Sequence, residues 1–299
     1  MVPAIPAGNS TPKTSYTSLR PGINSGRNCC DLIATESSSQ IPTPVTLPRY
    51  PPGKVNREYH KWFSPTLNRE MELLVFGQGG ARVLIFPTRQ GRFFDYEDWG
   101  LVNALGDAIR HGSIQLFCLD SLDSESLYCA AMPPRGRILR HGDYERYVIR
   151  EVIPFTATRN PDGELVSHGC SIGAYHAVNI AFRNPGTFTR VIGLSGRYDL
   201  TRPVGAFPDL FGGYYDNDVY FHTPNHFVPN LSEPALIDRF RSMEISLAVG
   251  ETDPFGESNR DLSSALWDKG IWHTLDFWEG EAHRAKFWRE MVQRYFRIS

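Results

Sequence analysis

The chain has 299 residues, of which 41% are hydrophobic and 12% aromatic, so it is long enough to bury a large core in one or two domains. Its 31 basic and 33 acidic residues nearly cancel and are scattered along the sequence. This balance gives no support for a nucleic-acid partner or an anionic membrane surface, and it favours a small, uncharged or mildly polar substrate.

Cysteine usage and hydrophobic runs indicate the compartment. The chain has five cysteines and no CxxC pair, so neither a zinc site nor a redox centre is expected. The first residues do not form a basic segment followed by an apolar one, and no run of about 18 apolar residues occurs. We therefore expect a cytoplasmic protein that does not span a membrane.

The first 52 residues differ in composition from the rest. They hold nine of the 22 prolines among many Ser, Thr, Gly and Asn residues, and they lack a sustained apolar period. Such a segment buries too little apolar surface to offset the entropy lost on ordering, so residues 1–52 are expected to form a disordered or extended N-terminal arm. A transit peptide is a weaker alternative because arginines are few. One α/β domain is expected over residues 53–299.

Short β-rich runs alternate with helical patterns from about residue 55 onward. This alternation predicts an α/β fold, with a central, mostly parallel sheet covered by helices on both faces. The glycine cluster at 77–80 reads as a turn between strands, because neither a lysine nor a helix follows it as a phosphate loop would require. The expected strands are 59–65, 71–77, 82–88, 114–121, 163–169, 190–196, 244–250 and 271–278, and the expected helices are 96–112, 144–155, 172–185, 234–243, 258–270 and 285–296.

The stretch Gly169-Cys170-Ser171-Ile172-Gly173 has the pattern G-x-S-x-G at the point where an expected strand ends and an expected helix begins. That context is the one a nucleophile elbow requires, so we interpret Ser171 as a nucleophile. The competing interpretation is a glycine-lined turn in which Ser171 caps the helix.

A serine nucleophile needs a general base and an acid that orients the base, in the chain order serine, acid, histidine. Asp253 follows the expected strand 244–250, and His283 lies in the loop before the last expected helix. Asp199, after the preceding strand, and Glu251 are the rival acids. Asp253 is favoured over both.

The remaining histidines have simpler interpretations. His168 lies on the strand before the elbow and His176 on the helix after it, where side chains point away from the serine hydroxyl. We expect both to pack under the elbow. His222 and His226 have a metal-like spacing, but Pro224 between them prevents the helix that would bring both to one face, so no metal site is expected. Structural roles suffice for His111, His141 and His273.

The oxyanion hole should have two backbone donors. One is the N–H of Ile172, directly after the nucleophile, and the other should come from the loop after the third strand. Thr88 and Arg89 in that loop are both candidates, and the spacing does not choose between them.

These features resemble the putative esterase family of α/β-hydrolases, which includes S-formylglutathione hydrolase, feruloyl and acetylxylan esterases and the mycolyltransferases. The likeness covers about residues 56–298 and is closest to small bacterial esterase-like members. It rests on the segments "ELLVFGQGGARVLIFPTRQGRFFDYED", "HGCSIGAYHAVNIAFRNP", "VIGLSGRYDL", "DNDVYFHTPNHFVPN" and "WEGEAHRAKFW".

The resemblance implies a triad of Ser171, Asp253 and His283. The sequence departs from the family pattern in three places. Cys170 stands where a small alanine is usual before the nucleophile, and Pro87-Thr88 replaces a common His-Gly pair. Arg284-Ala285-Lys286 replaces an aromatic, proline-containing run after the histidine.

The sequence thus predicts a serine esterase with no cofactor and a small-molecule ester as its partner. Neither nucleic acid nor a membrane is expected as a partner, and a homo-oligomer is compatible with the sequence. An acyltransferase or thioesterase with the same triad, and a silent hydrolase fold acting as a binding module, remain open. The aromatic stretch 198–230 is expected to form a lid or pocket wall.

Overall fold

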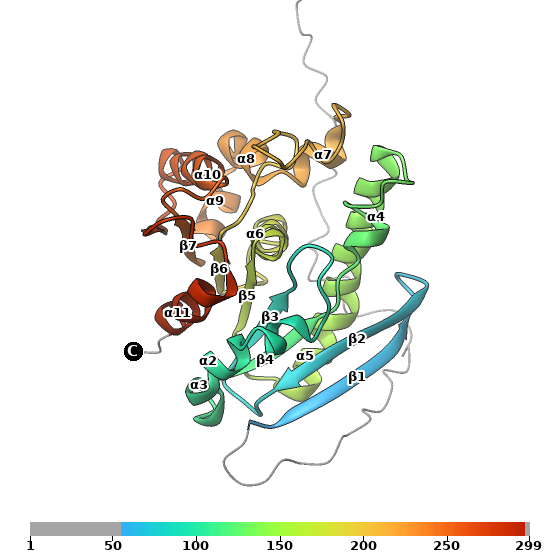
Figure 1. Ribbon diagram of the computed structural model, residues 1–299, viewed down its shortest axis with the longest axis vertical. Coiled ribbons are helices and arrows are strands. Elements are labelled where there is room, and N and C mark those ends of the chain that lie inside the picture. Colours follow the sequence, from blue (N-terminus) through green and yellow to red (C-terminus); the bar gives the residue numbers. More distant parts are fainter. Residues whose placement is uncertain (1–54, 297–299) are drawn as a thin grey trace, which may run out of the picture. The chain divides into compact units, whose positions relative to one another are not determined.

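The computed structural model describes residues 55–296, so the arm expected over residues 1–52 lies outside the described residues. Eight strands form one sheet in the order β1-β2-β4-β3-β5-β6-β7-β8 (Figure 1). Strand β2 runs antiparallel to its neighbours β1 and β4, and the other pairings are parallel. This arrangement confirms the expected α/β class.

The strands are short and mostly buried, which fits a sheet covered on both faces. Strand β4 is buried over its whole length, as is β5. The strand bounds are β1 (Arg57–Ser64), β2 (Arg69–Phe76), β3 (Ala81–Phe86), β4 (Ile114–Leu119), β5 (Leu165–Cys170), β6 (Arg190–Leu194), β7 (Glu244–Gly250) and β8 (Thr274–Trp278).

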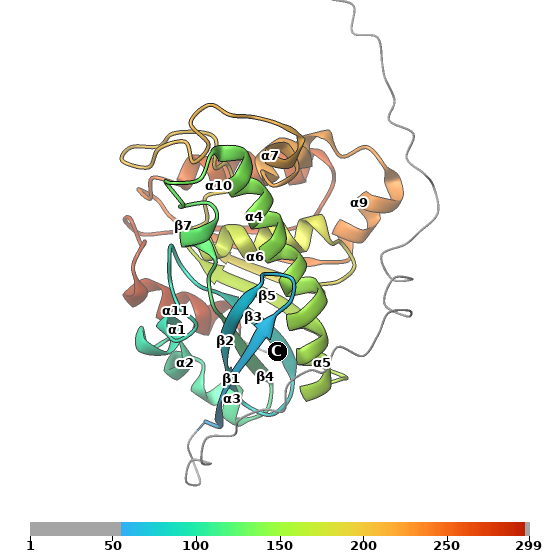
Figure 2. The same cartoon turned by 90° about the vertical axis from the view of Figure 1, so that its right-hand side faces the viewer.

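The helices cover the two faces of this sheet. In Figures 1 and 2, α11 lies beside α2 on one side of the sheet, while α4, α5 and α6 lie on the other. The helix bounds are α1 (Asp95–Asp98), α2 (Leu101–Ala104), α3 (Gly106–Arg110), α4 (Pro134–Tyr147), α5 (Ile153–Arg159), α6 (Ile172–Arg183), α7 (Asn217–Phe221), α8 (Pro224–Phe227), α9 (Pro234–Arg241), α10 (Gly256–Asp268) and α11 (Ala285–Tyr295).

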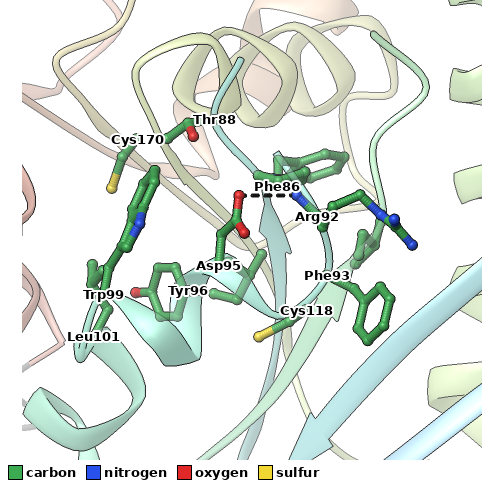
Figure 3. A pocket seen from close by; sticks show the side chains of 13 residues that line it. Phe86, Thr88, Arg92, Phe93, Asp95, Tyr96, Trp99, Leu101, Cys118 and Cys170 are labelled. Carbon is green, nitrogen blue, oxygen red and sulfur yellow. Dashed lines mark hydrogen bonds between the residues drawn. The ribbon is translucent and has the colours of Figure 1, made fainter. Parts of the chain in front are cut away.

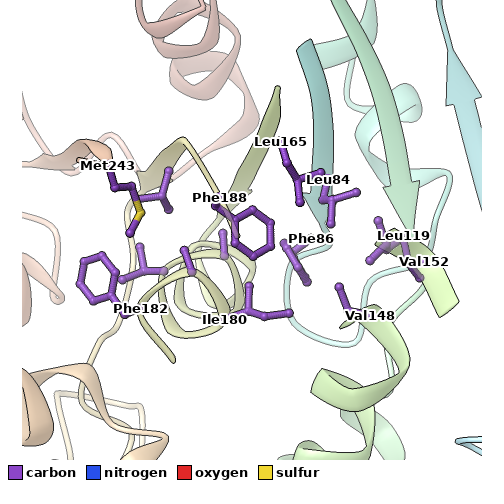
Figure 4. Close-up of a cluster of buried hydrophobic side chains, with 14 of the residues drawn as sticks. Leu84, Phe86, Leu119, Val148, Val152, Leu165, Ile180, Phe182, Phe188 and Met243 are labelled. Carbon is purple, nitrogen blue, oxygen red and sulfur yellow. The ribbon is translucent and has the colours of Figure 1, made fainter. Parts of the chain in front are cut away.

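Alternate residues of the strands enter two separate hydrophobic clusters. On β3, Leu84 and Phe86 belong to the cluster beneath α6, and Val83 and Ile85 belong to the cluster beneath α11. Figure 4 shows part of the first cluster, in which Ile180 of α6 lies near Phe86. This period of two follows from the alternating directions of side chains along a strand, and it fixes the register of the sheet.

The parallel register brings several strand ends to one edge. Phe86 pairs with Gly169, Cys170 with Leu194, and Leu194 with Ala248. The loops that follow β3, β5, β6, β7 and β8 therefore leave the sheet at the same edge, which is where ligand sites form in parallel α/β sheets.

Several helix boundaries differ from those expected. The helix expected over 96–112 is three short helices, because Gly100 takes φ 75° and interrupts it between α1 and α2. The helix expected over 144–155 begins ten residues earlier, at Pro134, and passes through a wider π turn at residues 148–152 before α5.

Two further differences concern the later part of the chain. The stretch 198–230, for which neither a helix nor a strand was expected beyond residue 198, contains α7 and α8. Strand β8 begins at Thr274, so His273, expected inside a strand, lies just before it.

Candidate active site

Ser171 occupies the turn from β5 into α6. Its backbone has φ 58° and ψ −125°, a combination that residues other than glycine rarely adopt. The Ser171 N–H donates to the Leu194 carbonyl at the end of β6 at 2.8 Å, and the Ser171 carbonyl accepts the N–H of Ala174 at 3.0 Å. A strained serine at a strand-to-helix turn is the geometry of a nucleophile elbow.

Two glycines allow the chain to close around this serine. A Cβ atom on Gly169 would lie 2.2 Å from the backbone of Gly173, and one on Gly173 would lie 2.3 Å from the Phe86 carbonyl oxygen. Both contacts are with backbone atoms, which cannot move aside as a flexible side chain can. The sequence pattern therefore reflects the close approach of α6 to β5 and to the end of β3.

His283 reaches Ser171 from the loop after β8. Its Nε2 lies 3.0 Å from the Ser171 Oγ. The imidazole is held between the rings of Phe255 and Trp288, with centroid distances of 5.5 and 5.4 Å. Trp288 is itself fixed by a hydrogen bond from its Nε1 to the Ser195 Oγ at 3.1 Å. The ring orientation of His283 is thus set by packing as well as by polar contacts.

Asp253 lies on the opposite side of the imidazole, in the loop after β7. Its Oδ2 is 2.8 Å from the Nδ1 of His283, and its Oδ1 accepts the N–H of Phe255 at 2.9 Å. The Asp253 side chain is fully buried. Because a carboxylate only accepts, Nδ1 carries the imidazole proton, and Nε2 is left free to accept the proton of the serine hydroxyl.

The rival acids have other positions. Asp199 lies 3.2 Å from the Nε2 of His226 instead of contacting His283. Burial alone would raise the pKa of Asp199, but hydrogen bonds from His226 and Thr201 hold it at about 2. Glu251 is exposed. The structure thus brings Asp253, and neither rival, to His283.

The histidines flanking the elbow lie beneath it. His168 Nδ1 lies 2.9 Å from the Ile192 carbonyl oxygen, and burial lowers the pKa of His168 to about 4. His176 Nε2 lies 3.0 Å from Asp123 Oδ1. Both rings are buried, and neither contacts Ser171 Oγ.

His222 and His226 do not lie together as two ligands of one metal ion would. His222 Nε2 lies 3.3 Å from Glu145 Oε2, whereas His226 pairs with Asp199. Pro224 occupies the first turn of α8 and separates the two histidines. Over residues 55–296, no three or more His, Cys, Asp or Glu side chains gather as a metal site would need.

The two sides of the expected oxyanion hole meet at the elbow. Ile172 is the first residue of α6, where N–H groups have no acceptor within the helix. A Cβ atom on Gly173 would lie 2.3 Å from the Phe86 carbonyl oxygen and 2.6 Å from that of Pro87, so the end of β3 lies directly against α6. Thr88 and Arg89 come next in the chain and therefore begin beside α6. The loop is further tied by Asp123, whose Oδ2 accepts the N–H of Gln90 at 3.2 Å.

Asp123 is not among the residues predicted from the sequence. Its place four residues beyond the end of β4, at the sheet edge where site residues gather, is the signal that could have indicated it.

A narrow pocket lies beside the elbow (Figure 3). Thr88 and Cys170 line it together with Asp95, Tyr96 and Trp99. Its volume of about 10 Å³ is enough for roughly one water molecule. Burial raises the pKa of the Cys170 thiol, which keeps the thiol neutral and lets Cys170 pack as a small apolar side chain.

The aromatic stretch 198–230 borders the start of α6. Ile172 and Tyr175 share a hydrophobic cluster with Phe211 and Val219 from this stretch. The buried guanidinium of Arg197 donates to the carbonyls of residues 199, 202 and 208, which holds the beginning of the stretch in place. The segment expected to form a lid or pocket wall therefore lies next to the start of α6, directly after Ser171.

Comparison with known proteins places this fold among esterases. Residues 139–293, more than half of the chain, match the family described as Putative esterase. None of the helices within residues 55–296 has the length and apolar character needed to cross a membrane. A search of curated protein sequences found no match.

Solved structures share the same architecture. A ferulic acid esterase aligns with a TM-score of 0.66 and 15% identity, over 81% of this chain and 96% of its own. A fluorophosphonate-binding serine hydrolase from Staphylococcus aureus aligns with a TM-score of 0.62 and 16% identity, over 81% and 97%. An S-formylglutathione hydrolase from Agrobacterium tumefaciens gives 0.64 and 15%, over 83% and 96%.

At these identities the structural likeness establishes the fold, and the family match establishes the class of protein. The chain therefore belongs to the putative esterase family and is a carboxylic ester hydrolase with the α/β-hydrolase fold.

Proposed function

We propose that this protein is a serine esterase that cleaves a small carboxylic ester through an acyl-enzyme on Ser171, with His283 as general base and Asp253 as the acid that orients it. The observation that carries the proposal is the continuous contact from Asp253 Oδ2 through His283 to Ser171 Oγ, with distances of 2.8 and 3.0 Å. Both lie in the range expected for a nucleophile and its base.

In the first half of the reaction, the Ser171 Oγ attacks the carbonyl carbon of the ester while its proton passes to His283 Nε2. The tetrahedral intermediate collapses as the C–O bond to the alcohol breaks, and His283 returns the proton to the departing alkoxide. Asp253 keeps the imidazole in the required tautomer and stabilises its charged form.

The second half repeats these steps with water. His283 Nε2 takes a proton from a water molecule that attacks the acyl carbonyl, and the proton then returns to Ser171 Oγ as the acid leaves. In both halves the negative oxygen would face the N–H of Ile172 and an N–H of Thr88 or Arg89.

Kinetics on p-nitrophenyl acetate test this proposal. Ser171→Ala and His283→Ala should each lower kcat by about 10³-fold or more, because the triad members act as a unit. His111→Ala changes an exposed histidine away from the sheet edge and serves as the matched control, so kcat should stay within about twofold of the wild type. Full activity in a folded Ser171→Ala or His283→Ala variant would contradict the proposed mechanism.

A further inference from the structure

The loop after β3 has a simple backbone hydrogen-bond pattern. Pro87 has no N–H, the Gly91 N–H donates to the Thr88 carbonyl at 2.8 Å, and the Gln90 N–H donates to Asp123 Oδ2 at 3.2 Å. The N–H groups of Thr88 and Arg89 have no acceptor among residues 55–296. They lie between two fixed points, the Pro87 contact with Gly173 and the Gln90 bond to Asp123.

The second fixed point holds a strained residue. Gln90 has φ 53°, a left-handed conformation that side chains other than glycine disfavour. It is the third residue of a turn closed by the Gly91 to Thr88 hydrogen bond, the position at which a type II turn requires positive φ. Without the bond to Asp123, the turn would be free to relax and to turn the Thr88 and Arg89 amides elsewhere.

Asp123 is a buried carboxylate with 2% of its surface exposed, and both of its oxygens are used. Oδ2 accepts from Gln90, and Oδ1 lies 3.0 Å from His176 Nε2. Its backbone is also fixed, because its N–H donates to Ser121 Oγ at 2.9 Å and its carbonyl accepts the Tyr128 N–H at 2.9 Å. The carboxylate therefore connects the loop after β3 rigidly to α6.

His176 provides the connection on α6, the helix that begins directly after Ser171. Its Nδ1 is buried and has no hydrogen-bond partner among the described residues, so Nε2 carries the proton and donates to Asp123. The ring stacks on Phe86, the last residue of β3, at a centroid distance of 6.2 Å. Both ends of the loop are thus held by the nucleophile helix.

We propose that Asp123 and His176 are a positioning pair that fixes the loop 88–91, so that a free N–H of this loop faces the oxyanion formed on Ser171. The inference rests on the proposed serine-esterase function and adds two residues that neither touch the substrate nor belong to the triad. It also explains why a polar side chain is buried at position 176, where an apolar one would otherwise pack.

Three substitutions test the pair. Asp123→Asn keeps the volume but replaces one accepting oxygen by an NH₂ group, so both bonds can form only if the His176 proton moves to Nδ1, which is buried and has no partner among the described residues. His176→Phe keeps an aromatic ring and loses the donor. His176→Gln keeps a donor near the place of Nε2, and we expect it to restore most of the wild-type behaviour.

The measurements separate positioning from stability. We would measure kcat and KM on p-nitrophenyl acetate, the melting temperature, and the inhibition constant of an alkyl trifluoromethyl ketone. Ser171 Oγ adds to the ketone carbon, its proton passes to His283, and the resulting alkoxide occupies the oxyanion hole. Active molecules are counted by titration with a fluorophosphonate, so unfolded protein does not enter the result.

In Asp123→Asn and His176→Phe, kcat should fall and the inhibition constant should rise by the same factor, about tenfold or more, since direct loss of one oxyanion donor costs 10²–10³. KM should stay within about twofold, because the ground-state ester does not depend on the oxyanion contact. His176→Gln should lie within about threefold of the wild type in both constants.

His141→Phe is the matched control. His141 is buried next to His176, with ring centroids 5.2 Å apart. Its polar contact is with Tyr175 Oη and not with Asp123. It should lower the melting temperature and leave the inhibition constant unchanged.

If Asp123→Asn and His176→Phe behave like His141→Phe, the pair is only structural and the inference is wrong, while the proposed esterase function stands. A folded wild-type protein that neither turns over the ester nor reacts with the fluorophosphonate would overturn both.

Discussion

Of the three Asp–His pairs near the carboxyl edge of the sheet, Asp253–His283 and Asp199–His226 each continue to a hydroxyl group, and only the first of these faces a strained serine. Asp253 and His283 are 2.8 Å apart, and the far nitrogen of His283 lies 3.0 Å from Ser171 Oγ. Asp199 and His226 are 3.2 Å apart, and the far nitrogen of His226 lies 2.9 Å from the Tyr215 hydroxyl.

The two pairs differ in the hydroxyl group that contacts the far nitrogen of the histidine, which is Ser171 Oγ in one pair and Tyr215 Oη in the other. Burial raises the pKa of Tyr215, so its hydroxyl stays protonated and its pairing with His226 is a structural hydrogen bond. Ser171 is held at φ 58° at the start of a helix, where unpaired N–H groups can stabilise an oxyanion. An aspartate beside a histidine is therefore not by itself a catalytic signature, and in the proposed mechanism the contact with the strained serine distinguishes Asp253–His283 from the other pair.

The largest effect that separates the two pairs should come from Asp253→Asn. An asparagine at this position can donate to Nδ1 and favours the wrong imidazole tautomer, so kcat on p-nitrophenyl acetate should fall by about 10²–10⁴-fold. Steady-state kinetics on folded protein, checked by circular dichroism, measure the effect.

Asp199→Asn is the matched control for this substitution. It removes the same charge from the other pair, so kcat on the same small ester should change less than about threefold. Similar losses in both variants would mean that the two pairs are not functionally distinct.

The next largest effect should come from Gly173→Ala, which tests whether the elbow requires its close packing. The added Cβ would meet the Phe86 carbonyl oxygen at 2.3 Å, so backbone must move. We expect a loss of about 2–4 kcal/mol in unfolding free energy, together with lower kcat, measured by urea denaturation and kinetics.

Gly142→Ala is the control, since Gly142 is also helical and an added Cβ would meet only the tip of Arg146 at 3.7 Å. This variant should be stabilised by about 0.5–1 kcal/mol, as for an ordinary helical glycine. Equal stability changes in the two variants would contradict the tight elbow.

A smaller and pH-dependent effect should come from His168, buried on β5 below the elbow. Its pKa is about 4 in the folded protein against 6.5 for the free side chain, so the unfolded chain binds the proton first. Stability should therefore fall as the pH decreases from about 6.5 to 4, with a contribution from this group of about 3 kcal/mol at the lower limit.

His168→Asn does not titrate, and its amide can still donate to the Ile192 carbonyl. Its unfolding free energy should depend less steeply on pH over the same range, as followed by urea denaturation. Parallel curves for the two proteins would show that His168 does not contribute.

Much of the fold could be predicted because the strands carry a clear apolar signal and follow one another in the α/β order. The helix expected over 96–112 was wrong because apolar spacing continues across Gly100, while its left-handed backbone ends the first short helix. The start of α4 at Pro134 was missed because its first four residues are only Pro, Arg and Gly, and Ile138 is the one buried apolar residue of this helix before Tyr144.

Less of the candidate site could be predicted. The order of Ser171, Asp253 and His283 is readable because each follows a strand whose end can be located. Asp123 also follows a strand end, but that place alone does not indicate its role, which depends on two contacts, with Gln90 and His176, that join distant parts of the sequence. Whether Thr88 or Arg89 provides the second oxyanion donor depends on where each backbone N–H points. The spacing of residues along the sequence carries no information about this direction.

Labelling with a fluorophosphonate, followed by mass spectrometry of the digested protein, tests the proposed mechanism most directly. Folded wild-type protein should carry one adduct, on Ser171, and Ser171→Ala should carry none, while His283→Ala should label far more slowly. Labelling at another residue would contradict Ser171 as the nucleophile. A folded wild-type protein that does not label at all would contradict it too and would favour a silent fold that acts by binding.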